Sequence, residues 1–320
     1  MSAAARLATR AIPCSRPNPS VGAMIVKDGR VIARGWTQPG GRPHAEAVAL
    51  AQAGKQARDA ALYVTLEPCA HASPRGPDCA GLVASSGIAR VVIGCQDPDP
   101  RTAGAGAARL RAAGVAVVLS EDRSCAASLA GYLTRRRLGR PHVTLKLALS
   151  ASGHLTPPQG QWLTGSIARA HVHAIRARMD AIVVGRGTFE ADRPRLDVRL
   201  PGIGERSPDR WLLTRGAAPG GWMRLASPHE IAAMADVQYL MVEGGAETAR
   251  AFLDAGLVDR LQIYRAPPEV GGSGACLPEL TAAALAVSPA WHCTDTRQLG
   301  NDSLHVYEPV HDHTPSHAGG

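Results

Sequence analysis

The 320-residue chain has few aromatic residues, no long apolar run and no cysteine framework. Only 4% of it is aromatic, which leaves few platforms on which single-stranded bases could stack. No segment approaches the roughly 18 consecutive apolar residues of a membrane span, and residues 1–10 lack the apolar core of a signal peptide. The seven scattered cysteines suit a reducing compartment. We therefore expect a soluble, cytoplasmic protein that does not bind a membrane.

The positive charge of the chain is diffuse. Lys and Arg number 35 against 27 Asp and Glu, a net charge of +8. The one dense basic run, Arg135 to Arg137, has no aromatic residues interleaved with it. This pattern favours an anionic small molecule over nucleic acid. We expect a phosphorylated small-molecule substrate and no nucleic-acid partner.

The length of the chain predicts two domains. A hairpin is expected around the Asp28-Gly29 step, and apolar runs then alternate with helical stretches, which is typical of parallel sheets layered with helices. Helices are expected at residues 44–54, 80–86, 106–113, 166–178 and 246–255. Strands are expected at residues 62–66, 91–94, 115–119, 142–149, 181–185, 210–214, 239–242 and 260–264.

A basic segment at residues 134–141, with Gly139 and Pro141, is predicted to separate the two halves. The first domain then covers residues 1–141 and the second residues 142–312. Residues 313–320 are predicted to form a disordered tail.

The strongest chemical signal is a set of four residues in the first half: His44, Glu46, Cys69 and Cys79. One imidazole and two thiolates can hold zinc and leave its fourth position open to water, whose pKa the metal lowers to about 7. Glu46 is placed to move a proton from that water to a leaving amine. Each residue alone would be unremarkable, but together they predict a zinc-dependent deaminase of a pyrimidine-type ring.

Four motifs of the first half resemble those of the bifunctional deaminase-reductase family of riboflavin biosynthesis. They are residues 16–22 (RPNPSVG), 43–46 (PHAE), 65–71 (TLEPCAH) and 97–100 (DPDP). The family also has a long gap between its two cysteines, as here. The resemblance implies a cytidine-deaminase-like α/β/α domain that removes ammonia from 2,5-diamino-6-(5-phosphoribosylamino)pyrimidin-4(3H)-one.

Carried over by position, the resemblance assigns roles to residues of this chain. His44, Cys69 and Cys79 would bind Zn²⁺, Glu46 would be catalytic, and Asn18, His71 and Arg75 would contact the substrate. Arg75 is the candidate for a basic side chain in the loop between the cysteines. Asp99 stands where the family tends to have Asn, which is a departure at a substrate contact.

The resemblance continues through the second half, on residues 145–148 (LKLA), 161–164 (QWLT), 191–196 (ADRPRL) and 255–259 (AGLVD). It implies a dihydrofolate-reductase-like α/β domain that uses NADPH to reduce the ribosyl group to ribityl. Residues 242–247 (VEGGAE) follow a strand and open a helix, a place where backbone N–H groups can receive a phosphate.

The implied reductase residues fall into three groups. Lys146 and Asp192 would be catalytic; Trp162, Thr164, Glu243, Gly244 and Gly245 would bind the cofactor; Arg176, Leu196 and Arg199 would hold the phosphorylated substrate. Arginines are the expected ligands of a phosphate dianion.

This half also departs from the family pattern. Ser152 stands where the family has a carboxylate, Gly160 and Arg193 replace other family residues, and residues 200–225 are shortened. One alternative is therefore a deaminase whose C-terminal domain only binds. A second, a nucleic-acid-editing deaminase, is suggested by the charge of +8 and opposed by the few aromatics and the cysteine spacing. The resemblance also implies a homo-oligomer.

Overall fold

The computed structural model describes residues 1–71, 73–156, 162–267 and 270–310. The predicted tail at 313–320 and the departure at Gly160 lie outside these residues. The chain forms two compact units, and the first contains Met1–His142 together with Ala232–Gln238. The second contains Val143–Ile231 and the described residues from Tyr239 onward. A short segment from the second half of the sequence thus packs with the first half.

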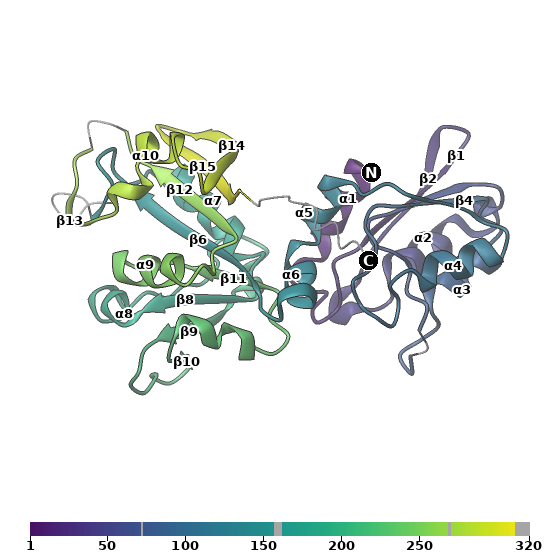
Figure 1. Cartoon of the computed structure of the whole chain (residues 1–320), viewed down its shortest axis with the longest axis horizontal. Coiled ribbons are helices and arrows are strands. Elements are labelled where there is room, and N and C mark those ends of the chain that lie inside the picture. Colours follow the sequence, from purple (N-terminus) through teal and green to yellow (C-terminus); the bar gives the residue numbers. More distant parts are fainter. Residues whose placement is uncertain (72, 157–161, 268–269, 311–320) are drawn as a thin grey trace, which may run out of the picture. The chain divides into compact units, whose positions relative to one another are not determined.

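The first unit is built on one mixed sheet. Its strands are β1 (Gly22–Lys27), β2 (Arg30–Trp36), β3 (Ala61–Val64), β4 (Arg90–Ile93) and β5 (Ala116–Leu119). They lie in the order β2-β1-β3-β4-β5 (Figure 1). β1 and β2 form the predicted antiparallel hairpin, and β3, β4 and β5 run parallel as the alternating pattern indicated.

Helices cover both faces of this sheet, and two glycines show how. A Cβ at Gly22 would lie 2.1 Å from the carbonyl oxygen of Ala4 in helix α1 (Ser2–Ala8), and one at Gly35 would lie 2.1 Å from that of Ala45 in α2 (Ala45–Ala53). Gly35 pairs with Ala23, the residue after Gly22, and successive residues of a strand face opposite sides. The two helices therefore pack on opposite faces, which gives the α/β/α layers.

The remaining helices of the first unit are α3 (Cys79–Ser85), α4 (Ala105–Ala112), α5 (Arg123–Ser128) and α6 (Ala130–Leu138). The sequence predicted α2, α3 and α4 to within a residue or two and missed α1, α5 and α6. The segment 134–141, interpreted as a separator, is helical as far as Leu138. Gly139 ends α6 in a left-handed conformation, with φ 70°. Only Gly139 to Pro141 connect it to the next strand.

The second unit holds a larger mixed sheet. Its strands are β6 (His142–Leu149), β8 (Ala181–Gly185), β9 (Asp209–Leu213), β10 (Met223–Leu225), β11 (Tyr239–Val242), β12 (Arg260–Arg265), β14 (Trp291–Leu299) and β15 (Asp302–Pro309). They lie in the order β10-β9-β8-β11-β6-β12-β15-β14 (Figure 1). The strands β7 (His154–Thr156) and β13 (Ser273–Cys276) pair with each other in a separate two-stranded sheet. The predicted strands are confirmed, whereas the β14–β15 hairpin was not predicted.

This sheet has a switch in strand order next to β11. The chain passes from β8 outward to β9 and β10, then returns to place β11 between β8 and β6. Its helices are α7 (Ser166–Arg176), α8 (Arg186–Asp192), α9 (Ala246–Asp254) and α10 (Ala282–Ala286). β8 and β11 run parallel, so both enter their helices, α8 and α9, at the same edge of the sheet. Such an edge is where open α/β sheets bind ligands.

Short 3₁₀ turns complete both units: η1 (Thr9–Ala11), η2 (Pro39–Gly41), η3 (Gly54–Ala57), η4 (Gly204–Arg206), η5 (Pro228–Ala233) and η6 (Pro278–Leu280). Among the helices of the described ranges, none has the length and apolar character that crossing a membrane requires. The predicted architecture, an α/β/α layer domain followed by a second α/β domain, is confirmed.

Candidate active sites

The first unit brings the predicted metal ligands together. His44 precedes α2 as its N-cap, Cys79 is the first residue of α3, and Cys69 lies in the loop after β3. The Nδ1 atom of His44 lies 3.3 Å from Sγ of Cys79 and 3.6 Å from Sγ of Cys69. One ligand atom from each of the three residues lies within 4.8 Å of the others. The three side chains converge as the ligands of one metal ion must.

The two thiols share a negative charge. Hydrogen bonding from the Cys79 thiol, together with contacts from His44 and the Cys79 amide, lowers the pKa of Cys69 to about 4. The Cys79 backbone N–H donates to Cys69 Sγ at 3.3 Å. The same interaction with Cys69, added to burial, raises the pKa of Cys79. These contacts favour the thiolate form of Cys69, the form that binds zinc.

Glu46 lies in the first turn of α2 and is buried, with 3% of its surface exposed. Its Oε2 atom has no hydrogen-bond partner among the described residues. Burial and the Cys69 thiolate raise its pKa to about 7, although His44 acts in the opposite direction. A carboxyl group with such a pKa can take up and release a proton at neutral pH.

Glu67, two residues before Cys69, has a supporting role that the sequence did not indicate. Its carboxylate accepts hydrogen bonds from the backbone N–H groups of Asp97, Gly104 and Ala107 at 3.3, 3.0 and 2.9 Å. The Gly104 and Ala107 N–H groups lie at the N-terminus of α4, so the Glu67 carboxylate caps that helix. The loop carrying Cys69 is thereby fixed to α4.

A cavity of about 190 Å³ opens above the ligands and includes all three predicted substrate residues on its wall. The Nδ2 atom of Asn18 lies 2.9 Å from the Gly41 oxygen and 3.2 Å from Nε2 of His44. His71 Nδ1 lies 3.3 Å from Thr102 Oγ1. Arg75 is exposed and donates to the Gly40 carbonyl. The cavity is also lined by residues that the sequence analysis did not assign to the site: Arg42, Arg101, Tyr132 and Arg136.

In the second unit an ion-pair cluster forms around Glu243, the residue that follows β11. The Glu243 carboxylate accepts from Nε and Nη2 of Arg176 at 2.6 and 2.8 Å, and Lys146 Nζ lies 3.6 Å away. Burial would raise the pKa of Glu243, but Lys146 and Arg176 outweigh it and hold that pKa below its ordinary value. Glu243 is a fixed anion. Of the predicted phosphate ligands, Arg176 is thus already bound to a carboxylate.

Two aromatic residues border this cluster. The Lys146 ammonium lies 5.8 Å from the ring centre of Tyr264, and the Tyr264 hydroxyl lies 2.8 Å from Nδ1 of His171. Tyr264 is on β12, which pairs directly with the strand β6 that carries Lys146. Neither Tyr264 nor His171 stands in a motif, so no sequence signal indicated them.

The Gly244-Gly245 turn joins β11 to α9. A Cβ at Gly244 would lie 2.4 Å from Cβ of Thr248, whereas one at Gly245 would meet only Thr188 Oγ1, at 3.4 Å. The Gly245 N–H donates to the Thr188 hydroxyl at 3.0 Å. Packing within the protein therefore requires glycine at 244, while it leaves room at 245.

The other predicted reductase residues lie apart from this cluster. Asp192 is the exposed last residue of α8, and no hydrogen bond or ion pair joins it to Lys146 or Glu243 in the part of the chain that the structure describes. Trp162 is 76% exposed beneath the Arg169 guanidinium. The Thr164 carbonyl accepts from the same Arg169.

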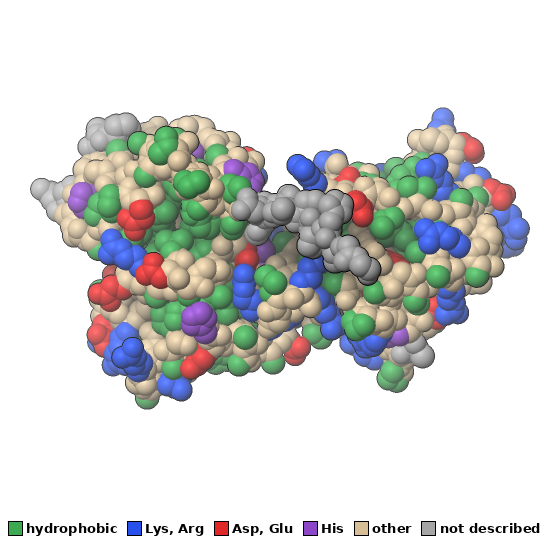
Figure 2. Space-filling view, viewed as in Figure 1, with side chains coloured by type: hydrophobic (Ala, Val, Ile, Leu, Met, Phe, Trp, Pro, Cys, Tyr) green, Lys and Arg blue, Asp and Glu red, His purple; other side chains and the backbone are tan. Residues whose placement is uncertain are grey.

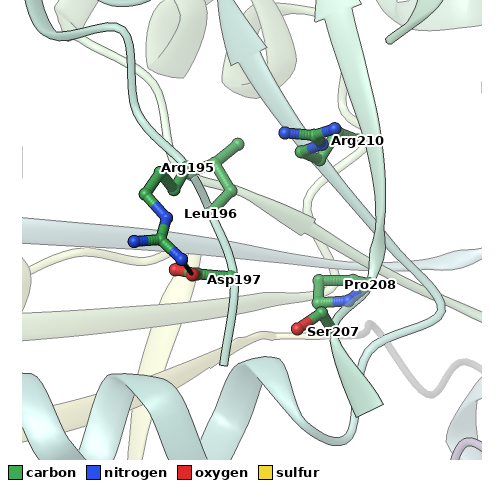
Figure 3. Close-up of a pocket in the computed structure, with 6 residues that line it drawn as sticks. All are labelled: Arg195, Leu196, Asp197, Ser207, Pro208 and Arg210. Atoms are coloured by element: carbon green, nitrogen blue, oxygen red, sulfur yellow. Dashed lines mark ion pairs between the residues drawn. The ribbon is translucent and has the colours of Figure 1, made fainter. Parts of the chain in front are cut away.

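Leu196 lines a second cavity, of about 300 Å³, between the loop after α8 and β9. Figure 3 shows the Arg195 guanidinium turned onto Asp197, at 2.7 Å, with Arg210 on the facing strand. Arg199 also pairs with Asp197, at 3.4 Å, and is exposed. Arg195 and Arg199 therefore both form ion pairs with the Asp197 carboxylate.

Ser152, which stands where the family has a carboxylate, forms a small polar cluster with Ser150 and His154. Its hydroxyl lies 2.9 Å from Nδ1 of His154 and 3.2 Å from the Ser150 hydroxyl. The side chain is exposed, so it can meet solvent as well as these partners.

Two family models match this chain. Residues 1–95 match the zinc-binding region of cytidine and deoxycytidylate deaminases. Residues 141–219 and 228–305 match the RibD C-terminal domain. The two models therefore cover the two halves that the sequence motifs had separated.

Full-length relatives and solved structures agree with these models. Riboflavin biosynthesis protein RibD of Haemophilus influenzae is 34% identical over 97% of this chain and 96% of its own, and that of Escherichia coli is 36% identical over 96% and 98%. RibD of Acinetobacter baumannii superposes with a TM-score of 0.82 at 33% identity, over 96% of this chain and 97% of its own.

A protein of Thermotoga maritima superposes with a TM-score of 0.84 at 29% identity, over 97% of each chain. It is described as a diaminohydroxyphosphoribosylaminopyrimidine deaminase and 5-amino-6-(5-phosphoribosylamino)uracil reductase. The family predicted from the sequence is confirmed. The chain belongs to the RibD family of riboflavin biosynthesis proteins and combines a zinc-type deaminase domain with a RibD reductase domain.

Proposed function

We propose that this enzyme deaminates 2,5-diamino-6-(5-phosphoribosylamino)pyrimidin-4(3H)-one in its first unit and then reduces the ribosyl group of the product in its second. The observation that carries the proposal is the convergence of His44, Cys69 and Cys79 beside a buried Glu46 whose Oε2 has no partner among the described residues. An unpartnered buried carboxylate oxygen marks the place of a polar group that binds there.

The donor set in the first unit fits zinc. Two thiols and one imidazole are the ligands that zinc prefers, and three protein ligands leave one position open. When bound, zinc would lower the pKa of a coordinated water to about 7. Glu46 takes a proton from the attacking water and delivers it to the amine that leaves as ammonia. Asn18 and His71 orient the pyrimidine in the cavity.

The second unit fits a nicotinamide cofactor at the edge where β8 and β11 end. No side chain covers the turn at Gly245, whose own N–H donates to the Thr188 hydroxyl, and α9 begins directly behind it with the N–H groups of its first turn. NADPH, when bound, would supply a hydride. Lys146 provides a cation that can stabilise the ribosyl oxygen and give it a proton, and Glu243 holds that ammonium in place.

We assign the remaining reductase roles from the family pattern. Asp192 would assist catalysis, Trp162 and Thr164 would contact the cofactor, and Leu196, Arg199 and Arg176 would meet the phosphorylated substrate. Arg176 can reach a phosphate only with donors that Glu243 and the Asp197 carbonyl leave free. Leu196 lines the second cavity and Arg199 pairs with Asp197 on its wall, which supports their place in this group.

The deciding experiment is an assay of zinc-loaded protein with the diaminopyrimidine phosphate, with and without NADPH. We expect ammonia in both samples and oxidation of NADPH only after deamination. Ammonia without NADPH oxidation would leave a deaminase with a binding domain, the alternative that Ser152 suggests. No ammonia release would contradict the proposal for the first unit.

A cytoplasmic location, a homo-oligomeric state and the absence of a nucleic-acid partner belong to the same proposal. On the face shown in Figure 2, the Lys and Arg side chains stand in separate groups between apolar and acidic ones. A nucleic-acid footprint is instead a continuous basic stripe. A gel shift with structured RNA at physiological salt would test this, and we expect no shift.

A further inference from the structure

A buried carboxylate on the wall of the deaminase cavity holds two arginines. The side chain of Asp99 is 4% exposed. Its oxygens accept from Nε and Nη2 of Arg101 at 3.0 and 2.6 Å, and from Nη2 of Arg136 at 3.0 Å. Hydrogen bonding from Arg101, with the charge of Arg136, lowers the pKa of Asp99 to about 2. Both guanidinium groups therefore pair with the same carboxylate, which keeps its negative charge.

Helix α6 fixes the second arginine. Tyr132 and Arg136 lie one turn apart on this helix; the Tyr132 hydroxyl donates to Asp97 at 2.8 Å, while Arg136 reaches Asp99 in the same loop. The Arg136 guanidinium also packs over the Tyr132 ring, 5.5 Å from its centre. Residues four apart share a helix face, so the two contacts reinforce each other. Arg101 and Arg136 are thus held next to each other.

The acidic and basic side chains around this cavity differ in burial. Its carboxylates, on Glu46, Glu67, Asp97 and Asp99, are all buried, and its arginines at 42, 75, 101 and 136 are exposed or half-buried. A guanidinium has five N–H donors, and Asp99 engages two of Arg101 and one nitrogen of Arg136. Each arginine therefore keeps N–H donors that Asp99 does not engage, and both line the cavity.

We propose that Arg101 and Arg136, held side by side by Asp99, bind the phosphate of the pyrimidine substrate and make the deaminase selective for a phosphorylated ligand. The proposal rests on the deamination proposed above. Two guanidinium groups at one point are the usual device for a phosphate dianion. Both residues lie outside the ranges that match the family models, 1–95 and 141–219 with 228–305.

The test compares Arg101→Gln, Arg136→Gln and the double variant with Arg137→Gln, a matched control on the same helix that does not line the cavity. The first readout is the ratio of kcat/KM for the phosphorylated pyrimidine to that for the dephosphorylated one. We expect each single variant to lower this ratio by about 10- to 100-fold, because each removes a hydrogen bond between charged groups. The control should keep the wild-type ratio. An unchanged ratio in the double variant overturns the proposal.

The second readout does not depend on turnover. Titration calorimetry with ribose 5-phosphate, and with ribose as its uncharged counterpart, measures phosphate binding directly. We expect the double variant to lose one ribose 5-phosphate site that wild type has, whereas any site at Arg176, Leu196 and Arg199 in the second unit should remain. Equal binding overturns the proposal even where wild type releases ammonia. Lost binding in a protein whose wild type releases no ammonia would instead contradict the deamination and leave the phosphate site standing.

Discussion

Glu46 in the first unit and Glu243 in the second each lie at or beside the start of a helix, and the two have opposite surroundings. Glu46 stands in the first turn of α2 with an unpartnered Oε2, and burial raises its pKa to about 7. Glu243 stands just before α9 with a side chain that is 8% exposed, and Lys146 and Arg176 keep its pKa low although burial would raise it. Burial raises the pKa of a carboxyl group, and the presence of neighbouring cations that outweigh it decides whether the group exchanges protons or stays an anion.

The difference matches the chemistry proposed for each unit. Hydrolytic deamination moves a proton from water to ammonia, so its carboxyl group must change protonation state. Reduction of a ribosyl group needs a positioned cation, so its carboxylate must keep its charge and hold Lys146. Substitutions in one unit should therefore leave the reaction of the other intact, and the predictions below use that separation.

The largest effect is expected from removing a zinc ligand. Cys79→Ser and Cys69→Ser should each lose zinc and all measurable deamination, because a hydroxyl is a far poorer zinc ligand than a thiolate. NADPH oxidation with supplied deaminated substrate should persist. Metal analysis and the two assays check this. Cys14→Ser, a thiol outside the site, serves as the control; full zinc occupancy in both site variants would exclude the ligand assignment.

The second-largest effect is expected for Glu46→Gln. The amide is nearly isosteric but cannot accept and return a proton, so deamination should fall by about 10²- to 10⁴-fold while zinc stays bound. The reductase activity should match wild type. Ammonia release measured on protein of confirmed zinc content decides it, and a wild-type rate would remove Glu46 from the mechanism.

The sequence alone predicted much of the first unit because its signals are local. His44, Glu46, Cys69 and Cys79 stand in motifs at element ends, and the Asp28-Gly29 step lies between two apolar runs, so pattern and structure agree. The roles of Glu67 and Asp99 were missing, since each depends on partners about 30 to 40 residues away or on another helix.

The second unit was predicted less completely, for physical reasons that particular elements show. β14 is largely exposed and polar, with the sequence WHCTDTRQL, so it lacks the apolar alternation that indicates a strand. The Lys146–Glu243–Arg176 cluster joins three separate elements, and no spacing in the sequence reveals it. The sequence also could not show that residues 232–238 pack with the first unit.

Glu243→Gln tests the anion of the second unit. It leaves Arg176 and Lys146 beside a neutral amide, and breaking such a buried pair typically costs about 3–5 kcal/mol of unfolding free energy. Because the folded pKa lies below the ordinary 4.5, the stabilisation is present above pH 4.5 and is lost as the pH falls through the folded pKa. The difference between variant and wild type should therefore shrink in acid.

Denaturant unfolding at neutral pH and below pH 4 measures this difference. Glu190→Gln is the matched control, since Glu190 forms an exposed pair with Arg186 and its loss should cost under about 0.5 kcal/mol. A pH-independent difference between Glu243→Gln and wild type would show that the charge of Glu243 is not what stabilises the unit.

The smallest effects separate packing from ligand approach within one turn. Gly244→Ala should destabilise the second unit by about 1–3 kcal/mol, because its Cβ would overlap Thr248, and a core that is overfilled must shift. Gly245→Ala should leave stability within about 1 kcal/mol of wild type, since its φ of −70° suits any residue and only Thr188 lies near. It should nevertheless raise the KM for NADPH, because the methyl group would stand where the phosphate approaches the backbone. Thermal unfolding and NADPH kinetics of the two variants decide it, with deamination as the internal control. If Gly245→Ala left both the stability and the KM for NADPH unchanged, the turn would be a plain connection and the cofactor would bind at another part of the sheet edge.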